Sequence, residues 1–307
     1  VRERTGIFYD RNINASPLEF RRQMEYIKKK FNLISMSELV ECYEQKRNLK
    51  PNSLMVTFDD GYRDVAFNAF PILKELGIPA VAFLITGVID TDAISWEDQI
   101  SFIFQTIPNG TVKITEDAVY SLKSPGEKDI SLWQVCKKLK EIRSIERNRI
   151  INELIETYQI DVEQMGKLAC SMNMGYMRSE EIQYWNNYGI EFGVHTITHD
   201  CLTELDFEDI NHEIVGSKRR IESILNKPIK AFAYPFGKDG DYNALTKSGL
   251  IKAGFKIGVI FESGINKPGT DPLELYRIGV EDNHRFRLDC HGITSLSPKE
   301  LVILLKK

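Results

Sequence analysis

Two adjacent carboxylates, Asp59 and Asp60, stand where an apolar run ends and a glycine follows. The run, residues 54–58, reads Leu-Met-Val-Thr-Phe, which is typical of a buried strand. Open α/β sheets and barrels bind their ligands at the C-terminal ends of such strands. Two carboxylates side by side there repel each other and lose hydration, so a cation or a bound proton usually compensates them. The alternative is an Asp-Asp-Gly turn that only closes the strand.

Two histidines, His195 and His199, follow a second short strand at residues 191–194. Two imidazoles four residues apart can reach one centre if the segment turns between them. With one carboxylate they make a His/His/Asp set, which leaves positions on a divalent metal for water and substrate. Thr196 stands where the His-Glu-x-x-His motif of zinc proteases has its glutamate, so that class of site is excluded. The alternative is two hydrogen-bonded histidines in a polar loop.

A third strand end, residues 231–237, reads Ala-Phe-Ala-Tyr-Pro-Phe-Gly. Aromatic residues flank Pro235, and Phe236 follows it. A turn of this kind can form a groove wall and present a free backbone N–H, the donor that an oxyanion needs. The alternative is a turn that ends a strand, with aromatic residues in the core.

The elements that must position these segments alternate between apolar strands and amphipathic helices. A helix over residues 64–76 and an apolar strand over 80–85 form a β-α-β unit with the first strand, which implies a parallel sheet. The alternation returns after residue 178 and gives six or seven strand–helix units, with late strands at 275–280 and 286–289 and a final helix at 298–306. We therefore predict an α/β fold, a distorted and incomplete (β/α) barrel. No Gly-x-Gly-x-x-Gly or P-loop motif favours a nucleotide-binding sheet.

Residues 88 to about 175 interrupt this alternation. Residues 98–107 and 131–158 have helical patterns, and the second is densely charged, as a solvated helix face is. We predict a single domain over residues 1–307 with a mostly helical insertion at about 88–175.

The composition bears on which partners the protein can bind and on where in the cell it is located. The net charge of −4 over 307 residues does not favour binding to nucleic acid. No apolar run is long enough for a transmembrane helix. The first residues do not form a signal peptide. The five cysteines are scattered, as free thiols in a reducing compartment are. We expect a cytoplasmic location, although a trimmed export signal would leave the same chain in the periplasm or outside the cell.

In this order at strand ends, Thr-Phe-Asp-Asp-Gly, His-Thr-x-Thr-His and Phe-x-Tyr-Pro-Phe-Gly resemble the motifs of the polysaccharide deacetylases. These are the nodulation-type deacetylases, or carbohydrate esterase family 4. The resemblance covers most of the chain from about residue 17 to 290, apart from the insertion. It implies a distorted (β/α) barrel and a hydrolase that removes acetyl groups from N-acetylated amino sugars of a polysaccharide or glycoconjugate. It also implies a divalent metal, usually Zn²⁺.

The resemblance assigns a role to each matching position. Asp59 is expected to be the general base that activates a metal-bound water. Asp60, His195 and His199 are expected to hold the metal. The backbone N–H of Phe236 corresponds to the oxyanion donor.

Two positions depart from the family pattern. Many members carry an arginine two residues before the proline of the third motif, and here Ala233 stands there. Arg277 is the best replacement, because arginine is unusual within an expected strand; the alternative is an outward-facing charge on an edge strand. The late Leu-x-His motif that usually supplies the general acid is also altered. We favour His284 for this role, and His291 remains open.

Two rival functions follow from these departures. One is an amidohydrolase that acts on a small non-sugar amide, since related sequences share the metal site. The other is a non-catalytic glycan-binding protein with the same fold. The complete metal set with Asp59 argues against the binding protein, whereas the altered third motif and the uncertain acid keep it open.

Overall fold

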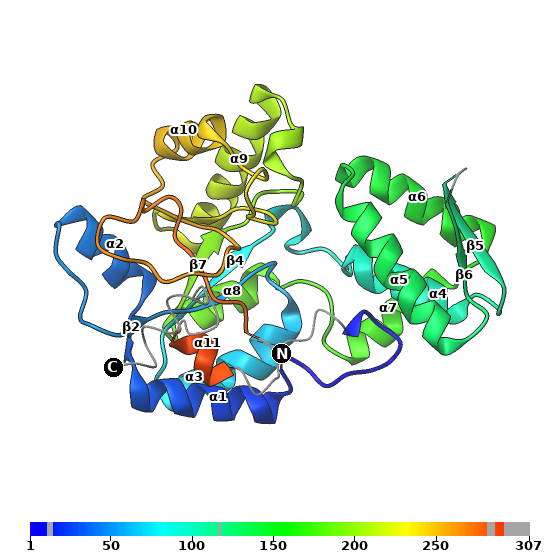
Figure 1. The fold of residues 1–307 in the computed structure, drawn as a ribbon, viewed down its shortest axis with the longest axis horizontal. Helices are drawn as coiled ribbons and strands as arrows, with labels where there is room; N and C mark the ends of the chain where they lie inside the picture. The colour runs from blue at the N-terminus through cyan, green and yellow to red at the C-terminus, as the bar shows by residue number, and fades with distance from the viewer. Residues whose placement is uncertain (11–14, 116–117, 281–285, 292–307) are drawn as a thin grey trace, which may run out of the picture.

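The computed structural model describes residues 1–10, 15–115, 118–280 and 286–291. Its centre is a five-stranded parallel sheet that curls into half of a barrel, which confirms the predicted fold class (Figure 1). The strands, in spatial order, are β3 (Val56–Phe58), β4 (Ala80–Leu84), β7 (Ile190–Val194), β8 (Ala231–Ala233) and β9 (Ile257–Val259). Every neighbouring pair is parallel, so the carboxyl ends of all five strands meet at one edge.

Two of the late strands that we expected do not form. In the segment expected at 275–280, Leu275 makes only an isolated bridge with Val259 of β9. Residues expected as an edge strand at 286–289 lie instead in a short helix, α11 (Phe286–Cys290). The expected final helix at 298–306 lies outside the described residues. The main sheet of the described chain therefore has five strands rather than six or seven.

Helices cover the outer face of the sheet, and alternate strand residues separate two cores. In β4, Ala80, Ala82 and Leu84 join the core under the outer helices, whereas Val81 and Phe83 join the core inside the curl. Because both faces are covered, β4 reads as an uninterrupted apolar run. The helices of this part are α1 (Pro17–Lys30), α3 (Phe70–Leu76, preceded by a π-helical stretch at Val65–Ala69), α8 (Ser179–Asn186), α9 (Phe207–Leu225) and α10 (Ala244–Lys252).

The inside of the curl is closed by the chain between the first helix and the first strand of the main sheet. Helix α2 (Met36–Glu44) places Leu39 and Val40 against Val81 and Phe83 in the inner core. A two-stranded parallel sheet, β1 (Asn32–Leu33) with β2 (Ser53–Leu54), flanks this helix. The half-barrel is thus packed on both sides, and its carboxyl edge stays open for a site.

The insertion forms a lobe of its own beside the half-barrel (Figure 1). It has a separate hydrophobic core, to which Ile100, Ile103, Val135 and Leu139 contribute. An antiparallel hairpin that the sequence analysis missed joins its helices, and the helix expected over 131–158 is two helices. The elements are α4 (Trp96–Thr106), β5 (Thr111–Thr115), β6 (Ala118–Ser121), α5 (Pro125–Lys140), α6 (Ser144–Thr157) and α7 (Val162–Ser171).

Residues 1–10, here called the N-terminal strap, run from the half-barrel to the insertion (Figure 1). Phe8 and Tyr9 are buried in the core of the insertion. At the other end, the Asn68 side chain donates to the carbonyl oxygen of Val1 over 2.7 Å. The strap therefore ties the two lobes together. Within the described residues, no helix combines the length and the apolar character that crossing a membrane requires.

Candidate metal centre and active site

Three predicted ligand side chains converge at the carboxyl edge of the sheet. Asp60 follows β3, and His195 and His199 follow β7. The two histidine Nε2 atoms lie 3.2 Å apart, and each lies 3.5 Å from Oδ1 of Asp60. Ligand atoms about 2.0–2.1 Å from one ion at tetrahedral angles lie about 3.4 Å from one another. The three donors, the one group of this kind in the described part of the chain, therefore have the spacing of a metal centre.

The surroundings of His195 leave its Nε2 free to bind a ligand. Its Nδ1 lies 2.7 Å from the carbonyl oxygen of Ala233 and donates a hydrogen bond to it, which puts the lone pair on Nε2. Such a contact to a backbone carbonyl is usual for a metal-binding histidine. Burial lowers the pKa of both imidazoles, that of His199 to about 4, so both are neutral at pH 7. Burial raises the pKa of Asp60, a cost that a bound cation relieves.

Asp59 is held by Arg277 through two parallel hydrogen bonds. Each terminal guanidinium nitrogen lies 2.7 Å from one carboxylate oxygen, and the arginine Nε donates to the carbonyl oxygen of Ile260 over 3.0 Å. Burial raises the pKa of Asp59, but Arg277 and the nearby imidazoles outweigh it and lower the pKa to about 2. Arg277 thus points into the site rather than outward, and Asp59 is ionised at neutral pH and able to accept a proton.

Phe236 closes the site from the third strand end. Its ring packs edge-on against His199 with 4.9 Å between ring centroids. Its backbone has a φ of 59°, in the left-handed region, and its N–H makes no hydrogen bond to another described residue. Gly237 comes next, and a Cβ there would lie 2.7 Å from the backbone nitrogen of Phe261, so the tight turn requires glycine. The turn therefore leaves the Phe236 N–H available to a ligand.

The model of one family, polysaccharide deacetylase, matches residues 46–130 and 132–258. The chain belongs to the polysaccharide deacetylase family. Curated relatives include the poly-beta-1,6-N-acetyl-D-glucosamine N-deacetylases of Staphylococcus epidermidis, 32% identical over 78 residues, and Staphylococcus aureus, 30% identical over 92 residues. These segments cover 25% and 30% of this chain and only 27% and 31% of the two relatives.

Solved deacetylase structures resemble the chain over most of its length. The Streptococcus pyogenes deacetylase PplD, in complex with acetate, has a TM-score of 0.57 and 18% identity, and the match covers 93% of this chain and 89% of that one. IcaB from Ammonifex degensii has a TM-score of 0.55 and 16% identity, with 90% and 88% covered. At these identities the similarity shows the shared fold.

In this member of the polysaccharide deacetylase family, residues 195–199, here called the histidine loop, are held by a residue that the sequence analysis missed. Glu213 of α9 is buried, and its carboxylate accepts hydrogen bonds from the backbone N–H groups of Ile197 (2.6 Å) and Thr198 (3.1 Å). It also accepts one from the Thr198 hydroxyl over 3.0 Å. The signal was present in the sequence, because Glu213 stands beside Ile214 and one turn after Ile210 on the buried face of an amphipathic helix.

The backbone of the site is locally strained. Asp60, Thr196 and His199 have φ values of 69°, 66° and 62°, which non-glycine residues rarely adopt, and Phe236 shares this conformation. Each such residue costs on the order of 1–3 kcal/mol and persists only where the surroundings hold it. Strain of this kind clusters at functional sites, and here the hydrogen bonds to Glu213 are part of what holds it.

Of the two histidines considered as the general acid, only His291 lies within the described residues. His284 lies outside the described residues. His291 lies beside α1, where its Nε2 is 3.2 Å from the Tyr26 hydroxyl and its ring packs against Phe31, 5.1 Å between centroids. These contacts are to the end of helix α1 and to the residue that follows it, and none is to a candidate metal ligand. The described geometry gives His291 no contact with the site.

Replacing Arg277 with methionine should move the acid limb of the pH profile of kcat/KM to higher pH. Burial would no longer be opposed by the guanidinium, so the pKa of Asp59 would rise from about 2 and its carboxylate would protonate earlier as the pH falls. Because the native pKa lies below the ordinary value of 3.8, the ion pair stabilises the fold above about pH 4, and this contribution is lost as the pH falls towards 2.

The same variant should lose roughly 10²-fold in kcat/KM at neutral pH, because Asp59 would no longer be oriented. Acetate release measured across the pH range checks both effects. Arg277→Lys is the control, since it keeps the charge without the two-pronged contact, and it should retain the wild-type acid limb better than methionine does. Equal profiles for all three proteins would mean that Arg277 does not govern Asp59.

Proposed function

We propose that the chain is a metal-dependent N-deacetylase that removes acetyl groups from N-acetylated amino sugars of a polysaccharide. The observation that carries the proposal is the Asp60, His195 and His199 donor set beside the Arg277-braced carboxylate of Asp59. Two curated relatives are named as deacetylases of poly-beta-1,6-N-acetyl-D-glucosamine, which makes that polymer the first substrate to test. The open cleft in which the site lies is lined by both the half-barrel and the insertion, which suits a polymer better than a small amide.

The donor set suits Zn²⁺, which takes imidazole nitrogen and carboxylate oxygen in four-coordinate sites with an open position. When bound, such an ion lowers the pKa of water to about 7 and polarises the amide carbonyl. His195 and His199 are neutral at pH 7 and can bind it without first losing a proton.

The remaining chemistry falls to the side chains and backbone around the ligands. Asp59, ionised and oriented by Arg277, accepts the proton of the attacking water. The Phe236 N–H donates a hydrogen bond to the oxyanion that develops on the amide oxygen. The leaving amine requires a proton, and we retain His284 as its donor.

We further propose that residues 1–307 work as one domain with an insertion at about 88–175. Asp200, which directly follows the metal ligand His199, accepts hydrogen bonds from the Ser144 backbone N–H (2.6 Å) and hydroxyl (2.8 Å) at the start of α6. The insertion is thereby coupled to the histidine loop, which supports a role for it in shaping the substrate cleft.

The test is acetate release by the zinc-loaded wild-type protein from oligomers of N-acetylglucosamine, with β-1,6 linkages first, and from a small amide. We expect about one divalent ion per chain and release from the oligomers. Release only from the small amide would favour the amidohydrolase. Failure to bind metal after reloading with zinc would overturn the mechanism and favour a glycan-binding protein.

A further inference from the structure

The insertion places a buried carboxyl group, that of Glu97, in the cleft of the active site. Glu97 belongs to the first turn of α4 and lines the same cleft as Asp59, Asp60 and His199. The charge of Asp60 contributes to the raised pKa of Glu97. Only 8% of the residue is exposed. In the described part of the chain, its carboxyl makes no ion pair and no hydrogen bond to another residue.

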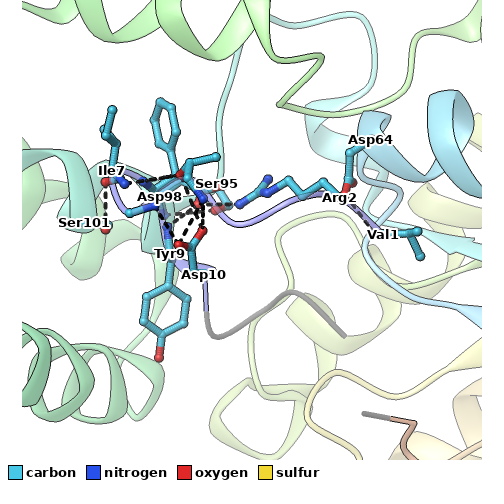
Figure 2. Close-up of polar contacts among 12 residues, drawn as sticks. Val1, Arg2, Ile7, Tyr9, Asp10, Asp64, Ser95, Asp98 and Ser101 are labelled. Carbon is cyan, nitrogen blue, oxygen red and sulfur yellow. Dashed lines mark hydrogen bonds and ion pairs between the residues drawn. The ribbon is translucent and has the colours of Figure 1, made fainter. Parts of the chain in front are cut away.

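The carboxylate of the neighbouring acid, Asp98, has hydrogen-bond and ion-pair partners on other residues, whereas that of Glu97 has none in the described chain. Figure 2 shows the N-terminal strap reaching Asp98, whose Oδ1 accepts from the Tyr9 backbone N–H over 2.8 Å and from the Arg2 guanidinium over 3.3 Å. Ser95 caps the helix by accepting from the Asp98 backbone N–H over 3.1 Å. The strap and the cap therefore fix the first turn of α4, and with it the backbone of Glu97, which lines the cleft.

Within the described residues, the hydrogen bond of the Glu97 carboxylate is to its own backbone N–H, so this buried group keeps acceptor capacity that a ligand can use. Burial raises the pKa of Glu97 to about 7, although a hydrogen bond from its own backbone N–H and the charge of Lys140 of α5 oppose the rise. The other charged groups around it are Asp60, Asp98 and Arg147, and the Arg147 guanidinium stacks on Trp96, 4.8 Å from the ring centroid. A carboxyl group in this state can both accept and donate hydrogen bonds, which matches the hydroxyl groups of a sugar.

We propose that Glu97 binds hydroxyl groups of the sugar residue that carries the acetamido group, so that the insertion supplies part of the substrate site. That the ligand is a sugar rests on the proposed function. The choice of Glu97 rests on its burial and its position in the lining of the cleft. Such binding makes Glu97 a determinant of specificity for a saccharide over a simple amide. Neither the metal nor the proton acceptor depends on it.

The experiment compares zinc-loaded wild type, Glu97→Ala and Glu97→Gln in binding to N-acetylglucosamine oligomers by titration calorimetry. A hydrogen bond to a charged or polar buried group contributes enough for alanine to weaken binding roughly 10- to 100-fold. Glutamine, which keeps the shape and the capacity to accept and donate, should recover part of the loss. Glu156→Ala, an exposed acid on α6 of the same insertion, is the matched control and should bind like wild type.

A second readout separates recognition from structure. Turnover of acetanilide, an N-acetyl amide without hydroxyl groups, should be the same in wild type and Glu97→Ala, and the metal content should not change. The proposal is overturned if wild type and Glu97→Ala bind the oligomers equally, or if neither binds them. It is also overturned if Glu97→Ala loses acetanilide turnover or metal together with oligomer binding. Failure of the proposed function has a different signature, because a metal-loaded wild type would then release no acetate while oligomer binding still reports on Glu97.

Discussion

Asp59→Asn should abolish most acetate release and leave the divalent ion bound. The ionised carboxylate is the proposed proton acceptor beside the donor set, and asparagine fills the same volume but cannot take up a proton. A positioned general base contributes about 10²–10⁴-fold to rate, so kcat should fall by that factor. Asparagine can still accept one hydrogen bond from Arg277, which limits the loss of stability. The measurement is acetate release together with metal content by elemental analysis.

Asp239→Asn is the matched control for this substitution. Asp239 is exposed, and its change should leave both release and metal content as in the wild type. If Asp59→Asn kept wild-type turnover, another group would be the base. If it lost metal as well as turnover, Asp59 would belong to the ligand set, and the assignment of separate roles to the two neighbouring carboxylates would be wrong.

His195→Ala should remove both the bound ion and acetate release. Its Nε2 is one of the three candidate metal donors that the described residues bring together, 3.2 Å from that of His199 and 3.5 Å from the Asp60 carboxylate. Loss of an outer partner of a ligand already costs 10–100-fold in metal affinity, so loss of a ligand should cost at least about 10²-fold. With the site empty, release should fall below detection. Metal content after dialysis against graded zinc concentrations measures the first effect.

Because His195 is only 2% exposed, alanine also leaves a cavity and deprives the Ala233 carbonyl of its donor. His195→Gln keeps more of the volume and should still lose the ion, which separates metal loss from unfolding. His212→Ala, an exposed histidine on α9, is the control and should keep metal and activity. Full zinc content in both His195 variants, with unchanged circular dichroism, would contradict the assigned metal centre.

Much of the fold was predictable because the hydrophobic periodicity within single segments indicates which of them form strands and helices. The uninterrupted apolar run of β4 reflects burial on both faces, and the amphipathic pattern of α9 reflects burial on one face. The prediction failed near the end of the chain, where the apolar pattern of 275–280 indicated a strand. There the backbone makes only one bridge to β9. Strand formation depends on an available partner edge, which the sequence of one segment does not reveal.

In the insertion, too, some elements were predicted from the sequence and others were missed. Its helical character followed from periodicity, but the hairpin of β5 and β6 did not. The break between α5 and α6 also escaped detection. Neither glycine nor proline marks it, and it falls at residues 141–143, within a densely charged stretch.

The sequence by itself determined which residue types stand at the carboxyl ends of the strands, because strand ends and motif spacings are local. From these it was possible to name Asp59, Asp60, His195, His199 and Phe236 as the candidate site. The sequence also offered Arg277 as the replacement arginine, but the tertiary structure decided that it faces Asp59 rather than solvent. Only the tertiary structure added Glu213 at the histidine loop and Glu97 in the cleft. Arg277 and Glu213 lie 15 to 218 positions away from the residues they contact, and Glu97 belongs to another lobe. Whether a charged side chain faces solvent or a buried partner depends on how whole elements pack, and that is a property of the assembled core rather than of any one segment.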